Sequence, residues 1–294
     1  MDSIITVGLN PTLQKTLVFS SLTGDAVNRC SEYRFDTAGK ALNVSRVLSQ
    51  LGKKNVHLTQ LGGSLRPVFL ELCARDGLNV KWTESQGAIR FCYTLIDKEK
   101  HQATELVEEG DAAGPGTEGR LLEIFDGLLP ESSALIIAGS RTAGFSDNII
   151  PEMVKRAKTA GLFTALDIRG ADLLNSLPFK PNLIKPNVEE FAATFAHGRG
   201  KEKIAAQCRS IWEAYGCSIV LTRGADSVLF AEAGNTEEFN IECVKAVNPT
   251  GSGDAFTAGL VSALLEGASF KAALAEGARC GRLNALNLKP GTVV

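Results

Sequence analysis

The stretch that decides the fold is Asn248-Pro249-Thr250-Gly251-Ser252-Gly253-Asp254, which runs into Ala255-Phe256-Thr257-Ala258-Gly259-Leu260-Val261-Ser262-Ala263-Leu264-Leu265. The first part has small side chains and glycines, and the second has apolar residues at helical spacing. The pattern predicts a tight glycine turn that opens a buried helix. Because the first amides of a helix are unpaired and its N-terminus is partly positive, such a turn is suited to bind an anion.

Asp254 follows this turn, at a helix N-terminus that stabilises an ionised carboxylate. A carboxylate beside a bound phosphate can orient and deprotonate an attacking hydroxyl, which is what a kinase requires. The alternative is structural: Asp254 caps the helix, and the glycines only form the turn. The stretch by itself leaves both interpretations open.

The composition indicates a globular protein and disfavours several classes of function. The chain has 294 residues, of which 44% are hydrophobic and 6% aromatic, and its formal net charge is −2. Because lysines and arginines are dispersed, we expect no nucleic-acid partner. The seven cysteines are scattered without a Cys-x-x-Cys pair, which favours reduced thiols and disfavours a structural zinc site. With no signal-peptide pattern and no apolar run of about 18 residues, we expect a cytoplasmic protein without a membrane partner.

Helices and strands alternate along most of the chain. The expected strands of the main sheet are 4–9, 56–61, 134–138, 162–166, 183–185, 218–222, 227–231 and 239–244. Besides the helix after Asp254, the expected helices are 40–51, 67–75, 120–129, 148–160, 203–214 and one from Val188, with a loop at 110–119. This alternation predicts an α/β fold with a doubly wound, mainly parallel sheet and helices on both faces.

Ligands of such sheets bind beyond the carboxyl ends of the strands. The residues at expected strand ends, which we expect to line one crevice, are Asn10, Gly139, Asp167, Lys185 and Thr222. Short and more exposed strands at 15–20, 33–35, 88–96 and 103–107 are expected to form a small sheet over that crevice, a lid. No linker or repeat divides the chain, so we expect 1–294 to be one domain, with lid strands from about 12–36 and 87–108.

Three further stretches carry groups that suit phosphates or cations. Lys40 follows Gly39 at a helix start, so amides and an ammonium could hold a substrate phosphate, or the lysine is simply solvated. Asn187 and Glu190 open another helix, where they could bind hydrated Mg²⁺ or form an ordinary cap. The segment 222–225 ends a buried strand and could offer amides to a nucleotide.

The order of these pieces resembles the ribokinase-like (PfkB) carbohydrate kinase family, and the resemblance spans essentially the whole chain. It runs from Asn10 through Gly39-Lys40, Lys185-Pro186-Asn187-x-x-Glu190 and Thr222-Arg223-Gly224-Ala225 to the 248–254 stretch. No G-x-x-x-x-G-K-[ST] loop and no strand-linked G-x-G-x-x-G is present, so the P-loop and dinucleotide-binding classes lose their main support. The segments 8–11, 43–48, 104–106 and 289–293 are similar to the 1-phosphofructokinase and tagatose-6-phosphate kinase branch.

This resemblance implies an ATP-dependent kinase, with Mg²⁺ as cofactor, that phosphorylates a hydroxyl of a phosphosugar. Asp254 is then the catalytic base, and the amides of Gly251, Ser252 and Gly253 form an anion hole for the transferring phosphoryl group. Asn187 and Glu190 serve Mg²⁺, and the nucleotide lies along Lys185, Asn187, Thr222, Gly224, Gly251 and Gly253. The implied substrate residues are Gly39, Lys40, Arg90 and Arg29 for the phosphate, with Asn10, Gln14 and Asn43 in the sugar pocket.

The sugar end departs from the family pattern more than the catalytic end does. Gln14 stands where the branch has an aspartate, and Ala41 where the family has a glycine. Arg141 and Arg169 replace a leucine and a serine, which suits an anionic substrate or adds surface charge. The second hypothesis is therefore a catalytically weak relative that binds a phosphosugar as a sensor. A homodimer through the lid strands is a further expectation.

Overall fold

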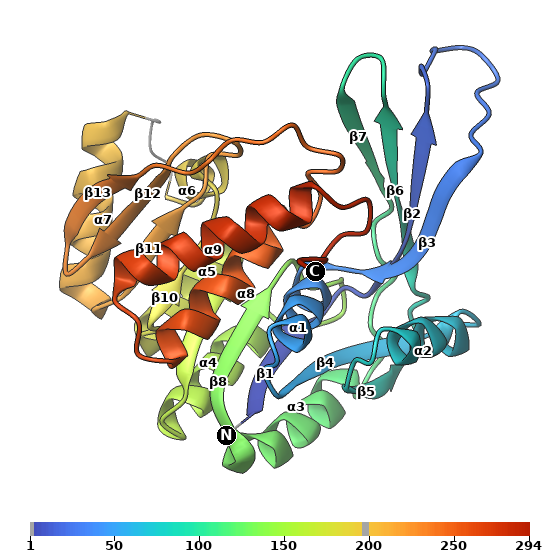
Figure 1. Cartoon of the computed structure of the whole chain (residues 1–294). Helices are drawn as coiled ribbons and strands as arrows, with labels where there is room; N and C mark the ends of the chain where they lie inside the picture. The colour runs from blue at the N-terminus through green and yellow to red at the C-terminus, as the bar shows by residue number, and fades with distance from the viewer. Residues whose placement is uncertain (1–2, 196–199) are drawn as a thin grey trace.

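A computed structural model of the chain describes residues 3–195 and 200–294. Within them, nine strands form the main sheet, in the order β13-β12-β11-β10-β9-β8-β1-β4-β5 (Figure 1). Neighbours from β11 to β5 are parallel, whereas β12 and β13 are antiparallel additions at one edge. The strands are β1 (Ser3–Gly8), β4 (Asn55–Gly62), β5 (Val80–Ser85), β8 (Ser132–Ala138), β9 (Phe163–Asp167), β10 (Leu183–Ile184), β11 (Ser218–Leu221), β12 (Val228–Glu232) and β13 (Asn235–Phe239).

Helices cover both faces of this sheet, which confirms the doubly wound α/β architecture. On one face lie α1 (Lys40–Gln50), α8 (Ser252–Leu265) and α9 (Phe270–Ala285). On the other lie α3 (Thr117–Leu128), α4 (Ile149–Thr159), α5 (Gly170–Ser176), α6 (Val188–Thr194) and α7 (Lys201–Tyr215). The remaining described α-helix, α2 (Arg66–Arg75), packs near the base of the lid (Figure 1). Short 3-10 helices follow α3 and α5, at Leu129–Glu131 and Leu177–Phe179.

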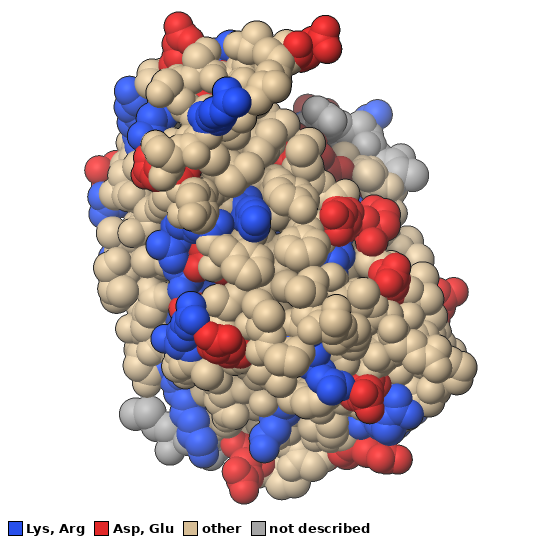
Figure 2. Space-filling model, turned by 90° about the vertical axis from the view of Figure 1, so that its right-hand side faces the viewer, with Lys and Arg blue, Asp and Glu red and all other residues tan. Residues whose placement is uncertain are grey.

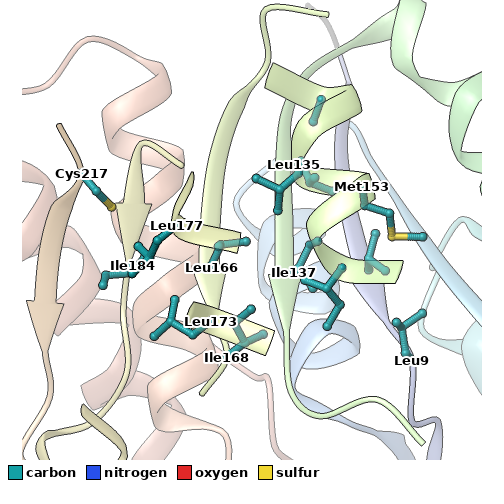
Figure 3. Close-up of a cluster of buried hydrophobic side chains, with 14 of the residues drawn as sticks. Leu9, Leu135, Ile137, Met153, Leu166, Ile168, Leu173, Leu177, Ile184 and Cys217 are labelled. Atoms are coloured by element: carbon teal, nitrogen blue, oxygen red, sulfur yellow. The ribbon is translucent and has the colours of Figure 1, made fainter. Parts of the chain in front are cut away.

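The central strands are apolar on both sides because each side meets a layer of helices. In β8, Leu135 and Ile137 face the α3–α7 layer, while Ala134 and Ile136 face α1, α8 and α9. Figure 3 shows part of the first cluster, with Leu135 and Ile137 beside Met153 of α4. The run of apolar residues in β8 therefore reflects burial on two faces.

A second sheet, the lid, contains β3 (Glu32–Ala38), β2 (Thr12–Phe19), β6 (Arg90–Asp97) and β7 (Gln102–Val107), in that order. Figure 1 shows it standing away from the main sheet. The expectation that its strands are exposed holds for β7, whose residues are all exposed, but is wrong for β2, which is mostly buried. The reason is that β2 lies between β3 and β6, and that Leu13 packs with Leu42 and Phe69.

Five other regions differ from the sequence expectations. The strand expected at 239–244 is wrong, because a turn at Ala233 and Gly234 places the antiparallel partner of β12 earlier, at β13. The loop expected at 110–119 is shorter, since α3 begins at Thr117. No element was expected for β5, α5 or α9.

The interior glycines of α9 are explained by its packing on α8. A Cβ atom at Gly277 would lie 3.0 Å from the carbonyl oxygen of Phe256, and one at Gly281 would lie 3.1 Å from that of Ser252. The glycines therefore lower the helix propensity of α9 but allow it to pack closely against the helix that begins at the glycine turn.

The outer surface has no single dominant charge on the face seen in Figure 2, where acidic and basic side chains are interspersed. In the described part of the chain, no helix combines the length and apolar character that a membrane span requires.

Candidate active site

A cleft lies beyond the carboxyl ends of the parallel strands and consists of two adjoining cavities. Cavity A, of about 450 Å³, is lined by Asn10 and Gly139, and cavity B, of about 360 Å³, by Lys185 and Thr222. Asp167 lines both. The five strand ends singled out in the sequence therefore meet at one cleft.

Two helix N-termini reach cavity B without a side-chain cap among the described residues. Helix α8 begins after Gly251, whose φ is 83°, and helix α1 begins after Gly39, whose φ is 116°. Both backbone conformations favour glycine. Gly39, Gly251 and Gly253 all line the cavity. Because uncapped helix starts expose unpaired amides, this wall of the cleft suits an anion.

Asp254 lies in the first turn of α8 and lines cavity B, with only 6% of its surface exposed. Its Oδ2 accepts a hydrogen bond from Asn43 Nδ2 at 2.8 Å, and no side-chain bond caps α8 within the described residues. Burial raises the pKa of Asp254 to about 6, although Lys40 acts in the opposite direction. A buried carboxylate with such a pKa is suited to accept a proton near neutral pH.

Asp167, at the end of β9, joins the sheet to α8 and to two lysines. It accepts hydrogen bonds from Lys40 Nζ at 3.2 Å and Thr257 Oγ1 at 3.1 Å, and its Oδ2 lies 3.0 Å from Lys185 Nζ. Burial alone would raise the pKa of Asp167, but Lys185 and Lys40 outweigh it and lower the pKa to about 2. The sequence placed Asp167 at a strand end and gave it no role. Its position after an apolar run was the available signal.

Lys40 and Arg90 approach the cleft from different elements, the start of α1 and the lid strand β6. Lys40 Nζ also lies 3.6 Å from Glu190 Oε1. The negative charge of Asp167, and to a smaller extent that of Glu190, raises the pKa of Lys40, although burial acts to lower it. Arg90, on lid strand β6, donates from Nε to Thr12 Oγ1 at 3.0 Å and lines both cavities. Arg29 is exposed between β2 and β3 and lines neither cavity, so the structure does not bring it to the others.

The sugar-pocket candidates divide between the two cavities. Gln14 lines cavity B, and its Nε2 donates to Thr94 Oγ1 at 2.6 Å, so one of its amide hydrogens is already bonded within the lid. Asn43 also lines cavity B, and it donates a hydrogen bond to Asp254 there. Asn10 lines cavity A, where its Nδ2 donates to Ser140 Oγ at 3.3 Å.

The two added arginines have different surroundings. Arg141 donates to Asp172 Oδ1 and to the carbonyl oxygen of Phe145, both at 2.9 Å, and is also paired with Asp147. These bonds hold it against the protein. The side chain of Arg169 is 70% exposed and lines cavity A, with its Nη1 3.8 Å from Glu190 Oε1.

Asn187 and Glu190 form a capping box at the start of α6. Asn187 Oδ1 accepts from the Glu190 amide at 2.7 Å, and Glu190 Oε2 accepts from the Asn187 amide at 3.1 Å. Both residues also line cavity B. Among the described residues no cluster of three or more His, Cys, Asp or Glu side chains could hold a metal ion by itself. The side-chain oxygens of Asn187 and Glu190 therefore suit a hydrated Mg²⁺, which needs few protein ligands, better than an ion bound by protein ligands alone.

Cavity C, of about 280 Å³, adjoins cavity B at Thr222 and Gly253, which line both. Gly224 and Ser252 also line it. Residues 241–244 of the segment expected as a strand at 239–244 line this cavity instead. One contact links the glycine turn to the lid: Thr250 Oγ1 donates to Glu105 Oε1 of β7 at 2.9 Å. Sequence reasoning did not assign Glu105 to the site.

The uncapped start of α8, a buried carboxylate and paired lysines at the carboxyl edge of a doubly wound sheet define a phosphoryl-transfer site. Residues 5–292 match the pfkB family of carbohydrate kinases, and the chain belongs to this family. It is therefore an ATP-dependent carbohydrate kinase.

Solved structures share this fold. Phosphofructokinase-2 from Escherichia coli, in complex with potassium, is 22% identical with a TM-score of 0.88, and the match covers 98% of this chain and 94% of that chain. A possible 1-phosphofructokinase from Thermotoga maritima is 20% identical with a TM-score of 0.89, covering 98% and 93%. Ribokinase from the same organism is 18% identical with a TM-score of 0.77, covering 100% and 96%.

Proposed function

We propose that this kinase transfers a phosphoryl group from ATP to a hydroxyl of a sugar that already carries a phosphate, as 1-phosphofructokinase and tagatose-6-phosphate kinase do. The observation that carries the proposal is the convergence of Lys40 and Arg90 on the cleft that contains Asp254. An ammonium at a helix start and a planar guanidinium are well suited to the oxygens of a phosphate. An unphosphorylated sugar would leave both cations without a ligand partner.

In this proposal, the sugar lies in cavity B with the acceptor hydroxyl at Asp254. Asn43 and Gln14 line the same cavity and can bond to sugar hydroxyls. The γ-phosphoryl group meets the amides of Gly251, Ser252 and Gly253, and Asp254 orients the hydroxyl and accepts its proton. The remainder of ATP follows Lys185, Thr222 and Gly224 into cavity C, whose lining is rich in small and apolar residues.

Asn187 and Glu190 are the residues we propose for Mg²⁺, through its water shell and the phosphates of ATP. When bound, the ion neutralises phosphate charge. Glu190 would then be shared between the capping box, the metal hydration shell and Lys40, which lies 3.6 Å from its Oε1. A lysine so placed can change partners as the substrate phosphate arrives.

A coupled ADP-release assay over hexose and pentose phosphates, each paired with its unphosphorylated sugar, tests this function. We expect turnover with at least one sugar phosphate and little with fructose or ribose. Efficient turnover of the unphosphorylated sugars would contradict the proposal. The sensor alternative is favoured by Gln14 and Ala41, and it predicts phosphosugar binding without ADP release.

We also propose that residues 1–294 act as one domain and that two copies associate through their lids. Strand β7 is an edge strand with every residue exposed, and exposed edges readily pair with another chain. Large apolar side chains are exposed on the lid, namely Tyr33, Leu106 and Val107. Light scattering on Leu106→Lys against wild type tests this, since a lid dimer should dissociate and a monomer should not change.

The cysteines support the cytoplasm as the compartment that we propose. All seven are described and none forms a disulfide. Reduced thiols are typical of that compartment, and localisation of a tagged chain would test the assignment.

A further inference from the structure

Arg46 is a buried arginine that lines none of cavities A, B and C, yet lies one turn after Asn43 on α1. Only 3% of its surface is exposed. Its guanidinium donates to Asn43 Oδ1 at 2.9 Å, Pro290 O at 3.0 Å, Thr37 O at 2.7 Å, Thr37 Oγ1 at 3.1 Å and Asp76 Oδ2 at 2.9 Å. A buried side chain with this many partners has one defined position.

The contact with Asn43 decides which way its amide faces. A guanidinium can only donate, so the amide must present its oxygen to Arg46. The other end, Nδ2, then faces Asp254 and donates to its Oδ2 at 2.8 Å. With the amide turned over, an oxygen would face the carboxylate and an NH₂ group would face the guanidinium, which are two repulsive contacts.

We propose that Arg46 is a positioning residue for phosphoryl transfer, because it fixes the orientation in which Asn43 donates to Asp254. It acts through Asn43 and does not contact the substrate. This inference rests on the proposed role of Asp254 as the base. It gives a function to a buried charge in α1 that neither holds a phosphate nor lines the nucleotide cavity.

The C-terminal segment holds Arg46 in place. Lys289 pairs with Asp76, the carboxylate that also binds Arg46 Nε. Beside it, a Cβ atom at Gly291 would lie 3.1 Å from Arg46 Nη1 and 3.2 Å from Asn43 Cα. The segment around Gly291 therefore packs tightly against Arg46 and Asn43, the two residues that orient the hydrogen bond to Asp254.

A double-mutant cycle on kcat tests the proposal, with wild type, Arg46→Met, Asn43→Ser and the double variant. Met keeps the volume of the stem and removes every donor. We expect Arg46→Met to lower kcat by about tenfold, the effect of one lost hydrogen bond. In the Asn43→Ser background the same change should lower kcat by less than about twofold, since sites that act as a unit are not additive. A full tenfold loss in both backgrounds would overturn the proposal.

The pH profile of kcat/KM gives a readout that simple destabilisation would not move. The charged groups around Asp254 are Lys40, Lys185 and Asp167, and none is altered in Arg46→Met. The acidic limb should shift upward by roughly one unit, because the carboxylate loses a donor. An unshifted limb would overturn the positioning role.

Arg46→Lys serves if Arg46→Met does not fold, because it keeps a cation for Asp76 and loses the planar fork. It should give the same non-additivity and pH shift, and wild-type behaviour would overturn the proposal. Asp76→Asn is the matched control, since it removes a partner of Arg46 and leaves the Asn43 contact. Asp76→Asn should shift the acidic limb of the kcat/KM profile by clearly less than Arg46→Met does. If Asp254→Asn retains full kcat, the base assignment fails, whatever the cycle gives.

Discussion

The catalytic end and the lid end of the cleft are built differently. At the catalytic end, Asp254, Asp167 and Lys185 are buried and bonded to groups of the main sheet or of helices packed on it. At the lid end, β7 is fully exposed. The difference teaches that the catalytic groups form an interlocked buried set, whereas the lid combines an exposed edge strand with the mostly buried β2. Gln14, a departure from the family pattern, lies on β2 and is itself buried, so it is not part of the exposed edge.

The sharpest test of the catalytic end is Asp254→Asn. The amide cannot accept the proton of the attacking hydroxyl, so we expect kcat to fall by about 10²–10⁴-fold, the usual contribution of a general base. ATP affinity should remain, because the amides of the α8 start are unchanged. Steady-state kinetics and calorimetric titration of ATP give the two quantities. A variant that keeps more than about a tenth of kcat would make Asp254 structural.

Lys40→Ala and Arg90→Ala probe the boundary between the two ends. Each removes one partner of a partly desolvated phosphate contact, which costs about 2–5 kcal/mol. The KM for the sugar phosphate should therefore rise by roughly 30-fold or more, with little change in the KM for ATP. Arg29→Ala is the matched control and should leave both constants near wild type, because Arg29 is exposed and lines neither cavity. Equal effects of the three substitutions on the KM for the sugar phosphate would contradict the assignment of Lys40 and Arg90 as the phosphate-binding residues.

The pH dependence of the reaction should report the burial of Asp254. Its pKa is raised to about 6, and the ionised form is the base, so kcat/KM should fall about tenfold for each pH unit below about 6. A sugar phosphate titrates in the same range, at about 6. The distinguishing measurement is therefore Asn43→Ser: losing the donor should move the acidic limb upward for the same substrate. A limb that stays in place would assign it to the substrate.

At the lid end, Gln14→Asp should have the smallest effect. One Gln14 amide hydrogen is bonded to Thr94, and the residue lacks the acceptor-only charge of the branch aspartate. We expect fructose-1-phosphate and tagatose-6-phosphate to be poor substrates, and Gln14→Asp to raise their kcat/KM by about tenfold, near 1.4 kcal/mol. A parallel specificity panel measures this. Wild-type kcat/KM above about 10⁵ M⁻¹s⁻¹ with fructose-1-phosphate would show that Gln14 is a tolerated variation.

The sequence predicted the alternating core well because each buried element carries its own local pattern. The strand ends Asn10, Asp167 and Thr222 could be placed at one edge from topology alone. Elements whose sequence is set by a neighbour were missed. Helix α9 contains Gly277 and Gly281 because α8 approaches closely, and no local pattern shows that approach.

Side-chain partners were beyond sequence reasoning for a similar reason. Lys40, on α1, meets Asp167, 127 positions away, and Arg46 meets Pro290, 244 positions away. The segment 239–244 was wrongly expected as a strand because residues that line a cavity can be as apolar as those of a strand. The order of the motifs located the cleft. Only the folded structure could show which side chains hydrogen-bond or pair with one another.

The most direct test of the central claim follows the labelled γ-phosphoryl group of ATP in the presence of each sugar phosphate. The account predicts that the label appears in a sugar bisphosphate with wild type and that Asp254→Asn abolishes the transfer. Label that remains in ATP while a sugar phosphate binds, or that passes only to water, would contradict it.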